Sequence, residues 1–112
     1  MDITQRQVGD VTVLDLSGKI TSTDSDGRLK EKVTGLVAEG HRKLVLNLSG
    51  VSFVDSSGLG ETVACYTTAK GKGGEVKLAG ATKRIKDLLV MTKLVTVFDS
   101  HDTLDGAIAA FK

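Results

Sequence analysis

Residues 43–60, KLVLNLSGVSFVDSSGLG, combine an apolar strand, a polar loop and the start of a helix. The strand at 43–48 is almost continuous in apolar residues, which is typical of a parallel strand covered on both faces. Gly50 interrupts the pattern, so we expect the strand to end before it. The polar tripeptide at 55–57 is followed by two glycines that let the backbone turn tightly into a helix. An exposed polar loop is therefore expected at the start of this helix.

The rest of the chain alternates between strand-like and helix-like segments. Residues 2–7 and 11–17 predict an antiparallel pair joined at Gly9-Asp10, with Gly18 ending the second strand and a loop at 19–23. Thr23 and Asp26 have the spacing of a capping box. The later expected elements are helices at about 27–40, 57–72 and 82–91, strands at 75–79 and 95–98, and a last helix capped by Ser100.

Each expected helix carries apolar residues at helical spacing, which indicates one face turned toward a core. These residues are Leu29, Val33, Leu36 and Val37 in the first helix, Leu59, Val63, Tyr66 and Ala69 or Lys70 in the second, Ile85, Leu88, Leu89 and Met91 in the third, capped by Thr82, and Leu104, Ala107, Ile108 and Phe111 in the last.

This alternation predicts an α/β fold, a single domain over residues 1–112 with a mostly parallel sheet. Ligands and reactive groups gather beyond the carboxyl ends of the strands in such sheets. The loops at 18–23 and 55–57 both belong to that edge.

Composition excludes several classes of function. Fifteen Lys and Arg residues stand against fourteen Asp and Glu residues, a net charge of +1, which argues against nucleic acid or an anionic membrane as the main partner. No apolar run approaches the roughly 18 residues of a membrane span, and the polar beginning MDITQRQVGD lacks the apolar region of a signal peptide. Cys65 is alone, which fits a reducing compartment, so the cytoplasm is the expected location. With two separated histidines and one cysteine, neither a metal nor another cofactor is expected.

The tripeptide Asp55-Ser56-Ser57 has four possible readings. The simplest is a helix N-cap, because Asp and Ser side chains accept otherwise unpaired backbone N–H groups. A catalytic serine needs a histidine base within hydrogen-bond reach. His41 is expected at the opposite end of the sheet and His101 two strands away, and the loop is not G-x-S-x-G. A phosphate cradle is disfavoured because Asp55 repels anions and no P-loop lysine is present.

The fourth reading is a serine that itself receives a phosphate. A small hydroxyl held by a strand and flanked by glycines gives another protein's active site room to approach. Phosphorylation adds about −1.5 to −2 charges. The adjacent helix N-terminus tolerates an anion, whereas a partner docked over Asp55 does not.

The stretch LVLNLSGVSFVDSSGLG (44–60) resembles the signature of STAS domains, in particular the bacterial anti-sigma-factor antagonists, in which D-S-[ST]-G-L-G opens a helix after an apolar strand. The similarity extends to the opening hairpin with Ser17-Gly18, to Gly73-Gly74 before a strand and to the helix at 82–91. The resemblance implies a right-handed β–α superhelix with an extra antiparallel N-terminal strand and about four helices.

The resemblance also implies a function. In the family, the serine after the motif's Asp is phosphorylated, which corresponds to Ser56, and the kinase is the anti-sigma factor itself, a GHKL-type serine kinase. The unphosphorylated antagonist binds this kinase and releases a sigma factor, and a serine phosphatase resets the cycle. The antagonist has no catalysis of its own.

The docking surface that the resemblance implies comprises the two loops and the start of the helix: Thr21, Ser22, Asp24, Asp55, Ser57, Gly58, Leu59 and Gly60. Family members have G-x-[LI]-D after the second strand, whereas this chain has Thr21 in place of the acid. Other STAS domains serve different signalling complexes or ABC-type lipid transport systems, which is the alternative function.

Several conspicuous residues are expected to be structural. Cys65 is interpreted as a small buried hydrophobe. Lys83, Arg84 and Lys86 are interpreted as a solvated helix face. His101 is expected only to begin the last helix.

Overall fold

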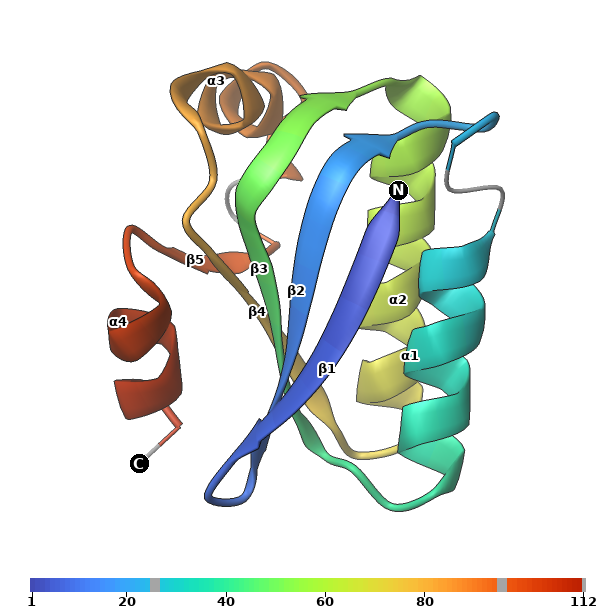
Figure 1. Cartoon of the computed structure of the whole chain (residues 1–112), viewed down its shortest axis with the longest axis vertical. Helices are drawn as coiled ribbons and strands as arrows, with labels where there is room; N and C mark the ends of the chain where they lie inside the picture. Colours follow the sequence, from blue (N-terminus) through green and yellow to red (C-terminus); the bar gives the residue numbers. More distant parts are fainter. Residues whose placement is uncertain (25–26, 95–96, 112) are drawn as a thin grey trace.

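The computed structural model describes residues 1–24, 27–94 and 97–111 (Figure 1). Within this part of the chain, five strands and four helices follow one another: β1 (Asp2–Val8), β2 (Val11–Ile20), α1 (Arg28–Ala38), β3 (Lys43–Val54), α2 (Ser56–Gly71), β4 (Glu75–Ala79), α3 (Lys83–Met91), β5 (Asp99–His101) and α4 (Leu104–Ala109).

The five strands form one mixed sheet in the order β1-β2-β3-β4-β5. β1 pairs with β2 in the antiparallel direction, and every other pair is parallel. The predicted α/β architecture, with an antiparallel N-terminal strand, a mostly parallel sheet and four helices, is confirmed. Because the strands lie in chain order, β5 is two strands away from β3.

The larger core lies between the sheet and α1, α2 and α3 (Figure 1). The apolar stripe predicted for α1 is confirmed, since all four of its members are buried. The sheet contributes four leucines to the same core: Leu14, Leu44, Leu46 and Leu78. Burying a side chain of this kind contributes roughly 1.5–3 kcal/mol, so this face makes the larger hydrophobic contribution of the two faces.

The buried face of α2 differs from the predicted one. Its buried residues are Gly58, Thr62, Cys65 and Ala69, whereas the large residues of the predicted stripe are half-buried. A hydrophobic pattern misses this face because α2 lies close to its neighbours and therefore turns small side chains inward. The structural interpretation of Cys65 is confirmed: the thiol is buried, and burial raises its pKa to about 12.

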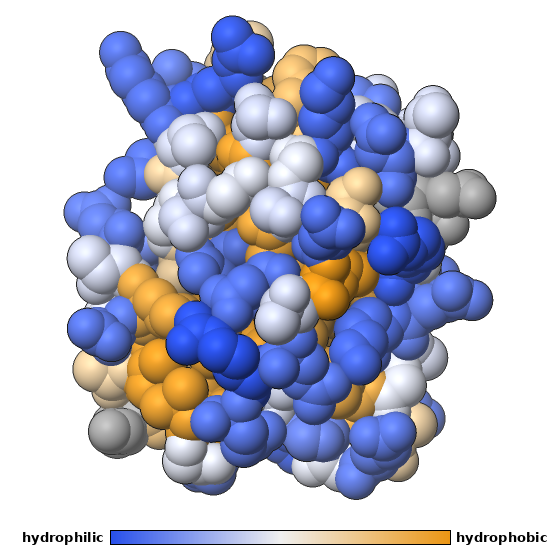
Figure 2. Space-filling view, viewed as in Figure 1, coloured by the Kyte–Doolittle hydropathy of each residue, from blue (hydrophilic) through white to orange (hydrophobic). Residues whose placement is uncertain are grey.

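The opposite face of the sheet is only partly covered by α4. Ala107 and Ile108 of α4 pack on Val11, Val13 and Val45. Figure 2 shows apolar side chains gathered over α4, on a face that is otherwise largely polar.

Beyond α4 the sheet carries a polar network that links three strands. Asp15 accepts hydrogen bonds from Arg6 at 2.5 and 3.0 Å and from Asn47 at 2.7 Å. The Arg6 hydrogen bonds hold the pKa of Asp15 below its usual range.

β2 and β3 are both longer than predicted. β2 continues through Gly18 to Ile20, and β3 continues through Gly50 to Val54. The pairing slips between Asp15 and Ser17 and again between Gly18 and Lys19. A Cβ on Gly50 would lie 2.8 Å from the carbonyl oxygen of Leu16, so Gly50 permits a close approach of the strands rather than ending one.

The C-terminal part of the chain differs most from the prediction. Residues 95–96 of the predicted strand 95–98 lie outside the described residues, and the observed strand, β5, begins only at Asp99. Phe98 instead enters the core, edge-on to the ring of Tyr66. Thr103, not Ser100, caps α4 through a hydrogen bond from the N–H of Gly106.

Two further differences concern α3 and α1. The prediction that Met91 faces inward is wrong, since this last residue of α3 is exposed. Asp26 of the expected capping box lies outside the described residues, and the N-cap of α1 is Gly27, with no side-chain hydrogen bond. A side chain from another helix instead accepts a hydrogen bond from the first turn of α1: the carboxylate of Glu61 in α2 accepts from the N–H of Lys30 at 3.0 Å.

Candidate functional site

The start of α2 is built around the side chain of Asp55. Asp55 has an extended backbone and is the N-cap, and its Oδ1 accepts a hydrogen bond from the N–H of Gly58 at 2.7 Å. The N-cap reading is therefore confirmed for Asp55. Ser56 and Ser57 become the first two helical residues, so the helix begins one residue earlier than predicted.

Gly58 fixes this helix start against the end of β2. It is buried, and a Cβ at this position would overlap the carbonyl oxygen of Ile20. The N–H of Asp55 donates to the same oxygen at 3.3 Å. Gly58 therefore allows a contact between backbones that no larger residue permits. Gly60 has no such role, since a Cβ there would meet nothing within 4 Å.

Ser56 and Ser57 both remain open to solvent. Both side chains are exposed, and neither hydroxyl forms a hydrogen bond within the described part of the chain. Leu59 is half-buried, and Gly60 is exposed. Asp55 thus satisfies the helix terminus while the two hydroxyls after it stay available.

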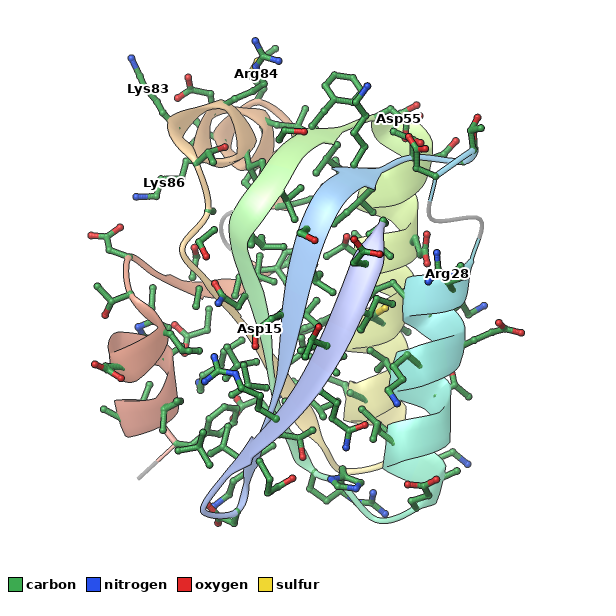
Figure 3. The ribbon with its side chains drawn as sticks, viewed as in Figure 1. Asp15, Arg28, Asp55, Lys83, Arg84 and Lys86 are labelled. Atoms are coloured by element: carbon green, nitrogen blue, oxygen red, sulfur yellow. The ribbon has the colours of Figure 1, made fainter. Side chains whose placement is uncertain are left out.

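The loop after β2 lies at the same edge of the sheet. Ile20 pairs with Val54 at the ends of β2 and β3, which brings residues 21–24 beside the start of α2. Thr21 and Asp24 form a local turn, in which the N–H of Asp24 donates to the Thr21 hydroxyl at 3.0 Å and that hydroxyl contacts the Asp24 carboxylate at 3.2 Å. Ser22 and Asp24 are exposed. The pairing of Ile20 with Val54 therefore brings the polar residues predicted for this surface to one edge of the sheet, where Figure 3 shows Asp55.

Two charges at the helix start act on an added negative charge: the partial positive charge of the helix N-terminus, which favours it, and the carboxylate of Asp55, which opposes it. The N-terminus of a helix carries a partial positive charge that stabilises an anion by typically 0.3–1 kcal/mol. The first turn of α2 contains no acidic residue, and only the Asp55 cap precedes it. A phosphate on either serine would meet this partial charge while standing in solvent.

No histidine is placed to activate Ser56. His41 lies at the opposite edge, where its Nδ1 is 2.6 Å from the hydroxyl of Thr12. His101 belongs to β5, two strands from β3, and its Nε2 is 3.1 Å from the carboxylate of Asp99. The geometry of a serine nucleophile with its base is therefore missing at Ser56.

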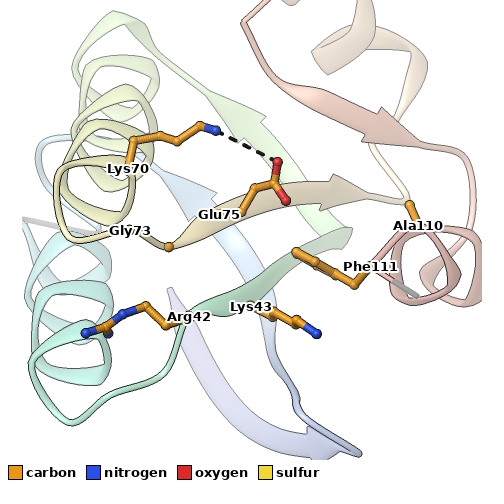
Figure 4. A pocket seen from close by; sticks show the side chains of 8 residues that line it. Arg42, Lys43, Lys70, Gly73, Glu75, Ala110 and Phe111 are labelled. Carbon is orange, nitrogen blue, oxygen red and sulfur yellow. Dashed lines mark ion pairs between the residues drawn. The ribbon is translucent and has the colours of Figure 1, made fainter.

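A basic hollow lies at the opposite edge of the sheet (Figure 4). It has a volume of about 380 Å³, and Arg42, Lys43 and Lys70 line it. Each cation is already engaged: Lys43 pairs with Asp10 at 2.5 Å, Lys70 with Glu75 at 3.9 Å, and Arg42 donates to the carbonyl of Val37 at 2.7 Å. Two of the three cations are therefore paired with carboxylates, which weakens the attraction of this hollow for an anionic ligand.

Comparison with known proteins agrees with this architecture. The sequence profile of the STAS domain family matches residues 2–107. The anti-sigma-B factor antagonist of Bacillus subtilis is 32% identical over 80 residues, which cover 71% of this chain and 72% of that protein.

Two solved structures show the same fold. An anti-sigma factor antagonist from Mycobacterium paratuberculosis matches with a TM-score of 0.85 and 26% identity, over 97% of this chain and 92% of that one. The phosphorylated form of the Bacillus cell fate determinant SpoIIAA matches with a TM-score of 0.76 and 18% identity, over 99% of this chain and 100% of the other.

The mixed sheet, the helix start at residues 55–60 and the profile match define a STAS-type fold. The chain belongs to the STAS domain family. The helices in the described ranges include none that is both long and apolar enough to cross a membrane.

Proposed function

We propose that this chain is a cytoplasmic anti-sigma factor antagonist that is switched by phosphorylation of Ser56. In its unmodified form it binds an anti-sigma factor of the GHKL serine kinase type and thereby frees a sigma factor. The kinase phosphorylates Ser56 and loses affinity for the product, and a serine phosphatase restores the binding form. The chain itself has no catalytic role.

One observation carries this proposal: Ser56 is an exposed hydroxyl at the start of a helix whose N-cap is already satisfied by Asp55. A structural cap has its oxygen occupied by a backbone N–H, whereas the oxygen of Ser56 is open to another protein's active site. The antagonists among the relatives support the class of partner.

The physical basis of the switch is a difference in solvation. In the free protein, a phosphate on Ser56 stays in water beside the positive end of α2, so the fold is expected to change little. In a complex, the dianion and Asp55 would both be covered. Desolvating an ion costs several kcal/mol, and each 1.4 kcal/mol corresponds to a tenfold change in affinity.

The docking surface in this proposal is formed by Thr21, Ser22, Asp24, Asp55, Ser57, Gly58, Leu59 and Gly60. In this chain Thr21 and Asp24 are hydrogen-bonded to each other. Asp24 then supplies the carboxylate of this loop, because Thr21 stands where other members of the family have an acid.

The assignment of the phosphate is tested by incubating the chain with ATP and a purified candidate anti-sigma kinase, followed by intact mass measurement. Wild type and the matched control Ser57→Ala should each gain a single phosphate, and Ser56→Ala should gain none. Phosphate on Ser56→Ala but not on Ser57→Ala would move the site to the neighbouring residue. Hydrolysis of an ester by the chain alone, lost in Ser56→Ala, would instead indicate an enzyme.

A further inference from the structure

A groove lies between the end of β3 and α3, on the side of the molecule that carries Ser56. It has a volume of about 490 Å³, and Phe53, Val54, Leu88 and Met91 form its apolar lining. Val54 is two residues before Ser56, a spacing of roughly 7 Å along an extended chain. The groove is therefore continuous with the proposed docking surface.

Several apolar side chains around this groove are exposed to an unusual degree. Met91 is 81% exposed, its neighbour Val90 60%, and Phe53 38%. Phe53 at the end of β3 and Met91 at the end of α3 both line the groove, and Val90 adds a further exposed apolar side chain on α3. Contiguous exposed apolar groups with a polar rim mark sites where a soluble protein binds a partner.

The charged rim of the groove indicates what kind of partner fits. Lys83 and Arg84 stand at the rim, and Figure 3 shows both extending outward from the top of α3. Neither forms an ion pair with a residue that the structure describes, in contrast to Lys86, which is bound to Asp102 at 2.6 Å. Asp87 is the only acidic residue lining this groove within the described ranges, so the rim remains net positive.

We propose that this groove receives an apolar side chain from an amphipathic helix of the partner protein, flanked by carboxylates that meet Lys83 and Arg84. The inference rests on the proposed function for the identity of that partner, the protein that docks over Ser56. The concave shape favours an inserted side chain over a flat membrane surface, and the two cations favour an acidic flank.

This arrangement also gives Ser56 a second way to control binding. A phosphate there would repel the same carboxylates that the rim of the groove attracts. The repulsion acts across solvent-exposed surface, where water and salt screen it, so it is modest, on the order of a twofold to fivefold change in affinity.

The test uses the whole chain, labelled with ¹⁵N, and a designed helical peptide as the probe. The peptide carries leucines at i, i+4 and i+7 with glutamates beside them, and a matched peptide carries lysine in place of each glutamate. The acidic peptide should shift the amide signals at the end of β3 and along α3, and the basic peptide should not. Added salt should weaken the shifts, because the contributing charges are exposed.

Variants separate charge from shape. The double variant Lys83→Glu, Arg84→Glu should bind the acidic peptide with about tenfold lower affinity than wild type. It should bind the basic peptide instead. These two acids stand in the first turn of α3, where they favour the helix, so the variant is expected to stay folded. Lys32→Glu, an exposed change on α1, is the matched control and should leave binding unchanged.

Several results would overturn the inference. They are equal shifts from both peptides, shifts scattered over the surface, no shifts at all, capture by anionic lipid vesicles instead of the peptide, or self-association of the chain through this face. The peptide experiment does not involve a kinase, so its outcome is independent of the phosphorylation assay. Peptide binding at the groove, together with no phosphate on Ser56 in the kinase assay, would sustain the groove and contradict the proposed function. No peptide binding, together with phosphorylation of Ser56 in the kinase assay, would contradict the groove and sustain the proposed function.

Discussion

Two strand-to-helix junctions lie at the same edge of the sheet and differ in how they are held. Between β3 and α2, Asp55 caps the helix at 2.7 Å and Gly58 lies directly on the backbone of β2. Between β4 and α3, Thr82 caps the helix at 3.4 Å, and Lys83 and Arg84 follow in solvent. The first junction is held against the backbone of a neighbouring strand, β2. The second is held by its own cap and by Ile85 and Leu89 in the core.

The difference supports the proposed switch at the first junction. A group that gains and loses a phosphate needs a fixed position and an open side chain at once. The β3–α2 junction provides both, because its anchor is a glycine in the backbone and its cap is Asp55, which leaves Ser56 unoccupied. The β4–α3 junction presents cations and an apolar surface instead, which suits recognition rather than modification.

The largest expected effect is that of Gly58→Ala. The added Cβ would overlap the carbonyl oxygen of Ile20, so either the helix or β2 must move. We expect a loss of at least about 3 kcal/mol in the free energy of unfolding, the upper end for overpacked sites. Urea denaturation measures this loss.

Gly60→Ala is the matched control two residues further along the same helix. Nothing lies within 4 Å of its Cβ position, so alanine should be neutral or stabilising by up to about 1 kcal/mol. Equal effects at the two glycines would contradict the account of the junction as a backbone contact.

The two caps should differ by a smaller amount. Asp55→Ala removes a short hydrogen bond to a charged carboxylate and is expected to cost about 1–2 kcal/mol. Thr82→Ala removes a longer one to a neutral hydroxyl and should cost less, about 0.5–1 kcal/mol. Thermal unfolding of both variants would compare them, and a larger loss at Thr82 would reverse the comparison.

Acid should act on the β4–β5 pair next to the second junction. The buried Lys77 holds the pKa of Asp99 below its usual value of 3.8 through their hydrogen bond. The carboxylate therefore stabilises the fold fully above that value, and its contribution is lost as the pH falls through the lowered pKa. Because Asp99 is half exposed, the contribution is below about 1 kcal/mol.

The variant Asp99→Asn checks this directly. Its stability at neutral pH should be slightly lower than that of wild type, and it should lose less between about pH 5 and pH 2. Parallel curves for the two proteins, from urea unfolding across that range, would show that the pair contributes nothing.

The smallest expected effect on stability is that of Ser56→Asp. The added carboxylate meets the positive end of α2 in solvent, so the free energy of unfolding should stay the same or rise by up to about 1 kcal/mol. Ser57→Asp, one position along, provides the comparison. A decrease of more than about 1 kcal/mol in the free energy of unfolding of Ser56→Asp would mean that the hydroxyl has a structural role.

Sequence patterns predicted the order of elements, the sheet type and the stripe of α1 because these follow from hydrophobic periodicity. They failed where contacts between distant segments, and not the local hydrophobic pattern, decide the structure. Gly50 resembles a strand break but accommodates a slipped pairing, and the buried face of α2 is hidden because its residues are small.

The candidate site was predicted in composition but not in geometry. The motif placed Asp55, Ser56 and Gly58 together. Which of them caps the helix, which stays exposed and which packs on the backbone depends on the position of Ile20, which is remote in sequence. The contribution of Glu61 to the start of α1 and the groove at α3 likewise depend on contacts between elements. No local pattern encodes such contacts.

The central claim is that one added phosphate leaves the fold intact and prevents docking. The most direct measurement is a calorimetric titration of the anti-sigma kinase with two preparations of this chain, unmodified and carrying phosphoserine at position 56. The account predicts binding of the unmodified chain and a loss of at least about a hundredfold in affinity for the modified one, with equal melting curves. Equal affinities of the two forms would contradict it.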